Sequence, residues 1–244
     1  MRTPYALFYT CFLIVISCFA PGFAALTTSQ RPVEFVAVIA SYNNERWCIK
    51  NLESVAMQTY PYLHIIYVND CSTDKTGELV ATFIKEHNLE DRCTLINNPV
   101  RKGAMQNFYE TISKIEPYKV VAHIDGDDWL KHNKVFELLA SIYQDGEIWV
   151  TTGNYETEPF TEPSICFGYP QKVLKACSFR RYKKWQGCQL RTFYAGLFHR
   201  IQKVHFMWNS QFLPMTQDFA VMLPLFEMAS QGHIHFVKEV IYVV

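Results

Sequence analysis

Three carboxylates fall within four residues at Asp125-Gly126-Asp127-Asp128. They follow the apolar run Val120–Ile124, which predicts a buried strand. Three like charges side by side repel one another unless a cation neutralises them. Mg²⁺ and Mn²⁺ prefer oxygen ligands and often bridge to the phosphates of a substrate. The spacing therefore indicates a metal–diphosphate site. The alternative is an acidic turn that caps the next helix.

The elements that must position these acids alternate along the chain. Between the apolar runs, residues three and four positions apart are apolar, which is typical of amphipathic helices. Short, β-branched-rich runs predict strands at 33–40, 64–69, 93–96, 120–124 and 147–152. This order predicts an α/β domain with a mostly parallel, Rossmann-like central sheet and helices on both faces.

Polar residues follow the first four predicted strands. They are Ser41, Asn43 and Glu45; Asp70, Ser72 and Asp74; Arg101 and Lys102; Asp125, Asp127 and Asp128. Ligands of parallel α/β sheets bind beyond the carboxyl ends of the strands, so we expect these residues on one edge. No glycine-rich phosphate loop follows the first strand, which argues against a Rossmann dehydrogenase and a P-loop kinase.

After Gly153 the alternation of predicted strands and helices is less regular. Residues 190–194 predict a strand or a short helix, and an apolar helix is expected from 216 onward, with Thr216 or Asp218 as its cap. Residues 234–244 predict a closing strand.

Composition and the N-terminal segment indicate which partners and which location to expect. The 23 basic residues balance 23 acidic ones, so no nucleic-acid partner is indicated. Residues 5–26 carry no charge, which predicts a secretory signal or an N-terminal membrane anchor over 1–26 and a domain over 27–244. This segment indicates membrane association or export, and a place on the cytoplasmic face stays open. The six later cysteines form no Cys-x-x-Cys pair, so we expect isolated thiols, with one or two disulfides if the domain is exported.

Together these segments resemble the family 2 glycosyltransferases, which have the GT-A fold. The resemblance rests on five stretches in the family's order: 38–45, 68–74, 98–107, the Asp-x-Asp motif at 125–127, and 216–218. The chain departs from the family at four positions, which are Ala40 for proline, Asn69, Cys71 for glycine, and Gln217 for glutamate.

The resemblance implies a role for each matching residue. The nucleoside pocket would be lined by Ala40, Ser41, Tyr42 and Glu45, with Asp70 bonded to the base. Lys102 would contact phosphate, Asp125 the ribose or sugar, and Asp127 would ligate Mn²⁺ or Mg²⁺. Asp218 would be the general base. Asp128 is left as a helix cap, with Trp129 packed beneath it.

The implied activity is inverting, metal-dependent transfer of a single sugar from a nucleotide-sugar donor. A UDP-sugar is favoured as donor, and the acceptor would be a hydroxyl of a glycan, lipid or protein. No Gln-x-x-Arg-Trp follows Asp218, which argues against a processive synthase. Two alternatives stay open: a non-catalytic nucleotide-sugar-binding module derived from a transferase, and a nucleotidyltransferase, which would normally carry a glycine-rich loop.

Overall fold

The computed structural model describes residues 31–159 and 166–244. The predicted signal or anchor over 1–26 lies outside these ranges. Within them, no helix has the length and apolarity that a membrane crossing requires.

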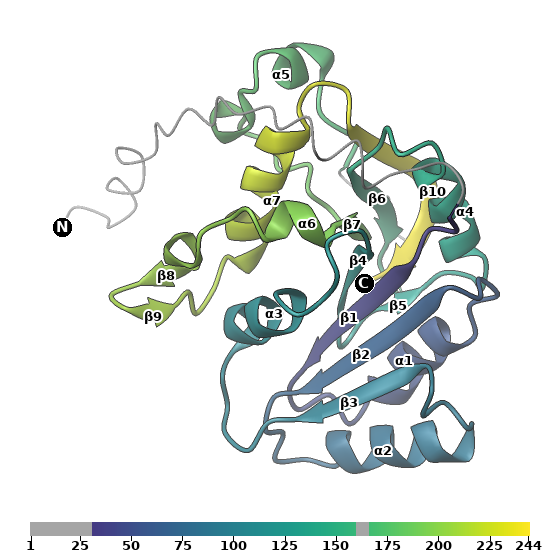
Figure 1. The fold of residues 1–244 in the computed structure, drawn as a ribbon. Coiled ribbons are helices and arrows are strands. Elements are labelled where there is room, and N and C mark those ends of the chain that lie inside the picture. The colour runs from purple at the N-terminus through teal and green to yellow at the C-terminus, as the bar shows by residue number, and fades with distance from the viewer. Residues whose placement is uncertain (1–30, 160–165) are drawn as a thin grey trace.

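An eight-stranded sheet forms the centre of the molecule, in the order β3-β2-β1-β4-β7-β6-β10-β5 (Figure 1). Its strands are β1 (Phe35–Ser41), β2 (Leu63–Asn69), β3 (Cys93–Asn97), β4 (Val120–Asp125), β5 (Trp129–Leu130), β6 (Val150–Glu156), β7 (Arg191–Tyr194) and β10 (Ile234–Val243). The β3-β2-β1-β4 half is parallel throughout. In the other half β7 runs antiparallel to both β4 and β6, while β10 is parallel to β6 and antiparallel to β5. The predicted mostly parallel α/β architecture is confirmed.

Helices cover both faces of this sheet. In Figure 1, α1 and α2 lie against one face and α3 lies on the other. The helices are α1 (Cys48–Ala56), α2 (Thr76–Glu86), α3 (Ala104–Ile112), α4 (Val135–Tyr143), α5 (Gln171–Lys175), α6 (Ala195–Phe198) and α7 (Gln217–Ala229). Two 3-10 turns, η3 (Phe179–Arg181) and η4 (Lys203–Phe206), and the hairpin β8 (Met207–Trp208) and β9 (Gln211–Phe212) complete the described chain.

The core is anchored at the start of β1. The Phe35 ring packs edge-on against Phe136 and Tyr143 of α4, with centroids 5.1 and 6.0 Å apart. All three side chains are almost fully buried. A buried aromatic of this kind contributes roughly 3 kcal/mol, so it fixes which face of β1 points inward and, with it, the register of the strand ends.

Two predictions about the middle of the chain are wrong. The strand expected at 147–152 begins at Val150 and continues through Gly153 to Glu156, because β10 pairs with it over that length. Asp128 is not a helix cap, since α4 begins only at Val135. Asp128 is buried instead and leads into β5, which pairs with the end of β10.

The cysteines divide into a disulfide and free thiols. Cys166 and Cys188 are joined, which is one of the options that the sequence left open. Cys48 and Cys93 are buried free thiols, as expected, while Cys71 is half-buried and Cys177 is exposed. The disulfide ties the segment just before β7 to the described chain that follows residue 165.

Candidate functional site

The carboxyl ends of the parallel strands meet at one edge. Ala40 lies opposite Asp125 in the β1–β4 pair, and Ser41 lies opposite Asn69 in the β1–β2 pair. Asn69 in turn lies opposite Asn97 of β3. The ends of these four strands therefore lie at one edge of the sheet, as expected.

The turns after β1 and β2 are held together by hydrogen bonds. The backbone N–H of Asn43 donates to Ser72 (3.0 Å), and the N–H of Thr73 donates to the Asn43 side chain (2.8 Å). The N–H of Glu45 donates to Asp74 (3.0 Å), while the Glu45 carboxylate accepts from the Lys75 N–H (3.2 Å). These bonds make one rigid surface of two turns that lie about 30 residues apart in the chain.

Asp70 fixes the loop that precedes α3. Its Oδ1 accepts from the Asn98 amide (2.9 Å) and the Lys102 N–H (2.8 Å), and its Oδ2 accepts from the Gly103 N–H (2.8 Å). Burial alone would raise the pKa of this carboxyl, but the Asn107 side chain and the three donors more than offset it and lower the pKa. Asp70 is 4% exposed, and its donors hold the backbone of Lys102 and Gly103 at this edge.

The same loop carries positive charge to this edge. The Arg101 guanidinium lies over the Tyr42 ring, 3.8 Å from its centroid, and so joins the loop to the turn after β1. The Lys102 ammonium pairs with Glu110 of α3 at 2.7 Å. The two cations are therefore held in place, and neither approaches the acidic cluster at the end of β4 through a direct ion pair.

The three carboxylates of the acidic cluster, Asp125, Asp127 and Asp128, differ in their exposure and in their contacts. The carboxylate of Asp125 accepts from the Gln189 amide (2.5 Å) and lies 3.2 Å from Nε2 of His123. Burial would raise the pKa of Asp125, yet the neighbouring His123 and Arg191 hold it well below its usual range. Asp127 is exposed, whereas burial, together with the charges of Asp125 and Asp127, raises the pKa of Asp128 to about 7.

The chemistry of this cluster fits a hard divalent cation. Asp127 has an exposed carboxylate near Asp125 and Asp128, and hard divalent cations favour such oxygen ligands. Burial, and after it the charges of Asp125 and Asp127, raises the pKa of Asp128. Among residues 31–159 and 166–244, no three His, Cys, Asp or Glu side chains form a metal cage of their own. An ion held by Asp127 would therefore complete its coordination with phosphate and water oxygens, as Mg²⁺ commonly does.

Asp218 is connected to this cluster through Arg191. The Nη1 and Nη2 atoms of Arg191 each donate to the Asp218 carboxylate at 2.9 Å. Arg191 lies opposite His123 in the β4–β7 pair, and its Nη1 is 3.4 Å from Nδ1 of that histidine. Thr216 is the N-cap of α7, but neither its side chain nor that of Asp218 caps the helix.

Three residues at this edge escaped the sequence-based prediction. Gln189 holds Asp125, Tyr242 accepts from the Asp125 N–H (3.0 Å), and Asn51 donates to the carbonyls of Asp125 and Asp128 at 2.9 and 2.6 Å. Asn51 could have been found from the sequence, because it is a polar residue on the apolar face of α1. Gln189 and Tyr242 could not, since their contacts depend on the order of β7 and β10 in the sheet.

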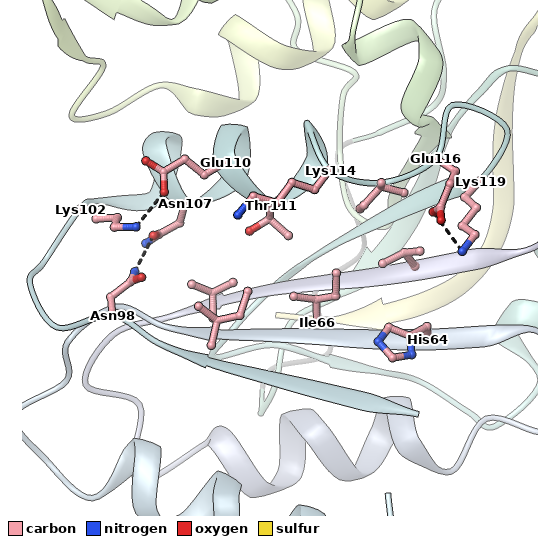
Figure 2. A pocket seen from close by; sticks show the side chains of 14 residues that line it. His64, Ile66, Asn98, Lys102, Asn107, Glu110, Thr111, Lys114, Glu116 and Lys119 are labelled. Atoms are coloured by element: carbon pink, nitrogen blue, oxygen red, sulfur yellow. Dashed lines mark hydrogen bonds and ion pairs between the residues drawn. The ribbon is translucent and has the colours of Figure 1, made fainter. Parts of the chain in front are cut away.

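A cavity of about 220 Å³ lies beneath α3, apart from the acids (Figure 2). Asn98, Lys102 and Asn107 line one end, and His64 and Lys119 line the other. None of Asp125, Asp127 or Asp218 lines it. We therefore place the candidate site at the carboxyl edge of the sheet, in front of the acids, and not in this cavity.

Comparison with known sequences shows the family of the chain. The profile of "Glycosyl transferase family 2" matches residues 36–204. "Glycosyltransferase GlyG" of Streptococcus pneumoniae serotype 4 is 32% identical over 120 residues, which are 48% of this chain and 38% of that protein. "Poly(ribitol-phosphate) beta-N-acetylglucosaminyltransferase TarS" of Staphylococcus aureus is 27% identical over 112 residues, 45% of this chain and 19% of TarS. The chain thus matches less than half of the length of these relatives.

Solved structures share the fold. S. aureus TarS 1-349 in complex with UDP-GlcNAc superposes with a TM-score of 0.63 at 15% identity, over 87% of this chain and 58% of that one. The mannosyltransferase PcManGT from Pyrobaculum calidifontis, in complex with GDP-Man and Mn²⁺, gives a TM-score of 0.59 at 16% identity, over 89% and 58%. The central sheet of this chain is therefore the sheet of GT-A glycosyltransferases.

Proposed function

The chain belongs to glycosyl transferase family 2, and from this premise we propose that it transfers a single sugar from a nucleotide-sugar donor to an acceptor hydroxyl. The observation that carries the proposal is the position of Asp125 opposite Ala40 at the carboxyl edge. This register sets the acidic cluster directly beside the turn after β1, so a nucleoside and its diphosphate can be bound across adjacent strand ends.

The donor site has a nucleoside side and a diphosphate side. Ala40, Ser41, Tyr42 and Glu45 line the first, and we expect the base to be bound beside Asp70. Arg101 and Lys102, on the loop that Asp70 fixes, supply positive charge for phosphate. A UDP-sugar is the favoured donor, in line with the UDP-GlcNAc complex of the structurally similar TarS.

The metal is assigned to Asp127. Bound Mn²⁺ or Mg²⁺ stabilises the charge of the departing nucleoside diphosphate as a Lewis acid. Asp125, which His123 and Gln189 hold in one orientation, contacts the ribose or the donor sugar. Asp128 is too buried to reach the donor and shapes the turn on which Asp127 stands.

Asp218 acts on the acceptor. It takes the proton of the attacking hydroxyl while the oxygen bonds to the anomeric carbon and the bond to the diphosphate breaks. Attack from the face opposite the leaving group inverts the anomeric configuration. The acceptor is a hydroxyl of a glycan, lipid or protein.

A second candidate function has its own support. Gln217 stands where the family has glutamate, and both oxygens of Asp218 are engaged by Arg191. A chain that binds a nucleotide sugar without transferring it would tolerate both features. A nucleotidyltransferase has no such support, because the turn after β1 carries no glycine-rich loop.

Product analysis separates these functions. The chain is incubated with UDP- and GDP-sugars, Mn²⁺ and a panel of alkyl glycosides, and the released nucleotide is identified. We expect a nucleoside diphosphate and a glycosylated product of inverted configuration. Donor binding without release supports the binding module, and release of a sugar 1-phosphate in place of the nucleoside diphosphate indicates nucleotidyl transfer. The exposed Asp91, at the opposite end of the sheet, provides a control variant, Asp91→Asn, for comparison with Asp127→Asn.

A further inference from the structure

Arg191 is a buried cation that links two separate acids. Its side chain is 6% exposed, and all three guanidinium nitrogens are engaged. Nε donates to the Gly187 carbonyl (2.6 Å), and Nη1 and Nη2 donate to Asp218. Through His123, which lies between Arg191 and Asp125, the guanidinium is connected to the end of β4.

The sheet itself creates this arrangement. Arg191 faces His123 across the antiparallel β4–β7 pair, and Asp125 lies two residues beyond His123, on the same face of β4. Gln189 and Arg191 are likewise two residues apart, so one short segment holds Asp125 with the first side chain and Asp218 with the second. The contact of Arg191 with Asp218 therefore links α7 to β7, whose register on β4 is fixed.

The ion pair leaves Asp218 able to act. Each carboxylate oxygen has two acceptor positions, and Arg191 occupies one on each. The Asp218 side chain is 34% exposed, so its free positions can meet an acceptor hydroxyl while the guanidinium stays buried behind it. Such a bidentate contact fixes the plane of the carboxylate, which a lysine ammonium would not do.

We propose that Arg191 is a positioning residue: it orients Asp218 toward the acceptor hydroxyl and, through His123, holds it at a fixed place relative to Asp125. This inference rests on the proposed function, in which Asp218 takes the proton of the hydroxyl. A misplacement of about 1 Å in such a group can cost on the order of 10²-fold in rate. Arg191 is buried behind Asp218, so we expect its loss to affect turnover and to leave donor binding intact.

The same helix offers a matched control. Arg180 forms a bidentate pair with Glu227 near the far end of α7, at 2.5 and 2.9 Å, with side chains 42% and 30% exposed. Arg180→Lys removes the same kind of pair from the same helix. It is expected to leave turnover within about twofold of wild type.

The test compares Arg191→Lys with wild type and with Arg180→Lys. Release of UDP from a UDP-sugar, with water or an alkyl glycoside as acceptor, gives kcat, and calorimetric titration gives the donor Kd. For Arg191→Lys we expect kcat to fall on the order of 10²-fold while Kd changes less than twofold. Unchanged kcat would overturn the positioning role. So would a parallel loss of kcat and donor binding, because that would assign Arg191 to the stability of the whole edge.

Chemical rescue provides a second readout. In Arg191→Ala, added guanidinium ion at low millimolar concentration can occupy the vacated position behind Asp218, and we expect it to restore part of kcat. Donor binding by this variant shows that it is folded, and absence of rescue in a variant that binds donor contradicts the inference. If the wild-type chain releases no UDP from any donor, the proposed function fails and this role with it. Wild-type turnover with an unimpaired Arg191→Lys overturns only the role of Arg191.

Discussion

Gly126 lies against Ser41 so closely that a side-chain carbon at position 126 would be 2.8 Å from both Cβ and Oγ of Ser41. The same carbon would be 2.7 Å from the Asn44 amide nitrogen. The turn that carries Asp125 and Asp127 is thus packed directly on the turn after β1. The glycine between the two acids is required by this contact, and the acidic cluster cannot shift without moving the turn after β1.

Gly126→Ala is expected to separate the two turns. Overpacking of this kind costs about 1–3 kcal/mol, which urea denaturation will measure as a loss in the free energy of unfolding. The double variant Ser41→Gly/Gly126→Ala removes the carbon that the new methyl group would strike. Its loss should be smaller than the sum of the two single losses, and strict additivity would show that the contact is not responsible.

Cys71→Gly is expected to stabilise the protein. Cys71 has a φ of 60°, a left-handed conformation that costs a non-glycine residue roughly 1–2 kcal/mol, and the family has glycine at this position. Relief of that cost, less the entropy that glycine adds to the unfolded chain, should raise the free energy of unfolding by about 1 kcal/mol. Cys71→Ala retains Cβ and serves as the control. Equal stability of the two variants would contradict the explanation.

The pH dependence of stability should reveal Asp70. Its pKa is lowered in the folded protein, so its contribution is fully present above the unfolded value of about 4 and is lost as the pH falls through the folded value. Asp70→Asn places an amide against the N–H donors of Lys102 and Gly103 and should cost about 2–4 kcal/mol at pH 7. Between pH 5 and pH 2, wild type should lose stability more steeply than the variant. Parallel curves in this interval would refute the assignment.

Gln189→Leu tests how Asp125 is held. Loss of the hydrogen bond from the buried Gln189 amide to the half-buried Asp125 carboxylate should lower the free energy of unfolding by about 1.5–3 kcal/mol. Gln106→Leu removes a similar amide–carboxylate bond to Glu110, but Gln106 is only half-buried, and about 1 kcal/mol or less is expected there. The prediction fails if the two variants lose the same stability.

The parallel half of the sheet was predictable because its signals are local. β1, β2, β3 and β4 are short β-branched runs, and each ends at the polar residue that the rule for parallel sheets places at one edge. The second half was less predictable. β5 has only two residues, and its partner at the end of β10 lies more than 100 residues away, so Asp128 was mistaken for a helix cap.

The site shows the same division. The places of Asp125, Asp127 and Asp70 at the strand ends follow from local sequence, but the neighbours that contact Asp125 do not. Arg191 and Gln189 reach Asp218 and Asp125 only because β7 inserts antiparallel between β4 and β6. No local pattern encodes that insertion, since it depends on which distant strands pair.

Binding of a UDP-sugar with and without Mn²⁺ is the decisive measurement for a metal at Asp127. Calorimetric titration of wild type and Asp127→Asn, each in Mn²⁺ and in chelator, measures whether the carboxyl edge binds a nucleotide sugar through a metal at Asp127. We expect wild type to bind at least about tenfold more tightly with Mn²⁺, a difference of 1.4 kcal/mol, and Asp127→Asn to lose that gain. Equal Mn²⁺-dependent binding by both proteins, or no binding by wild type, would contradict the account.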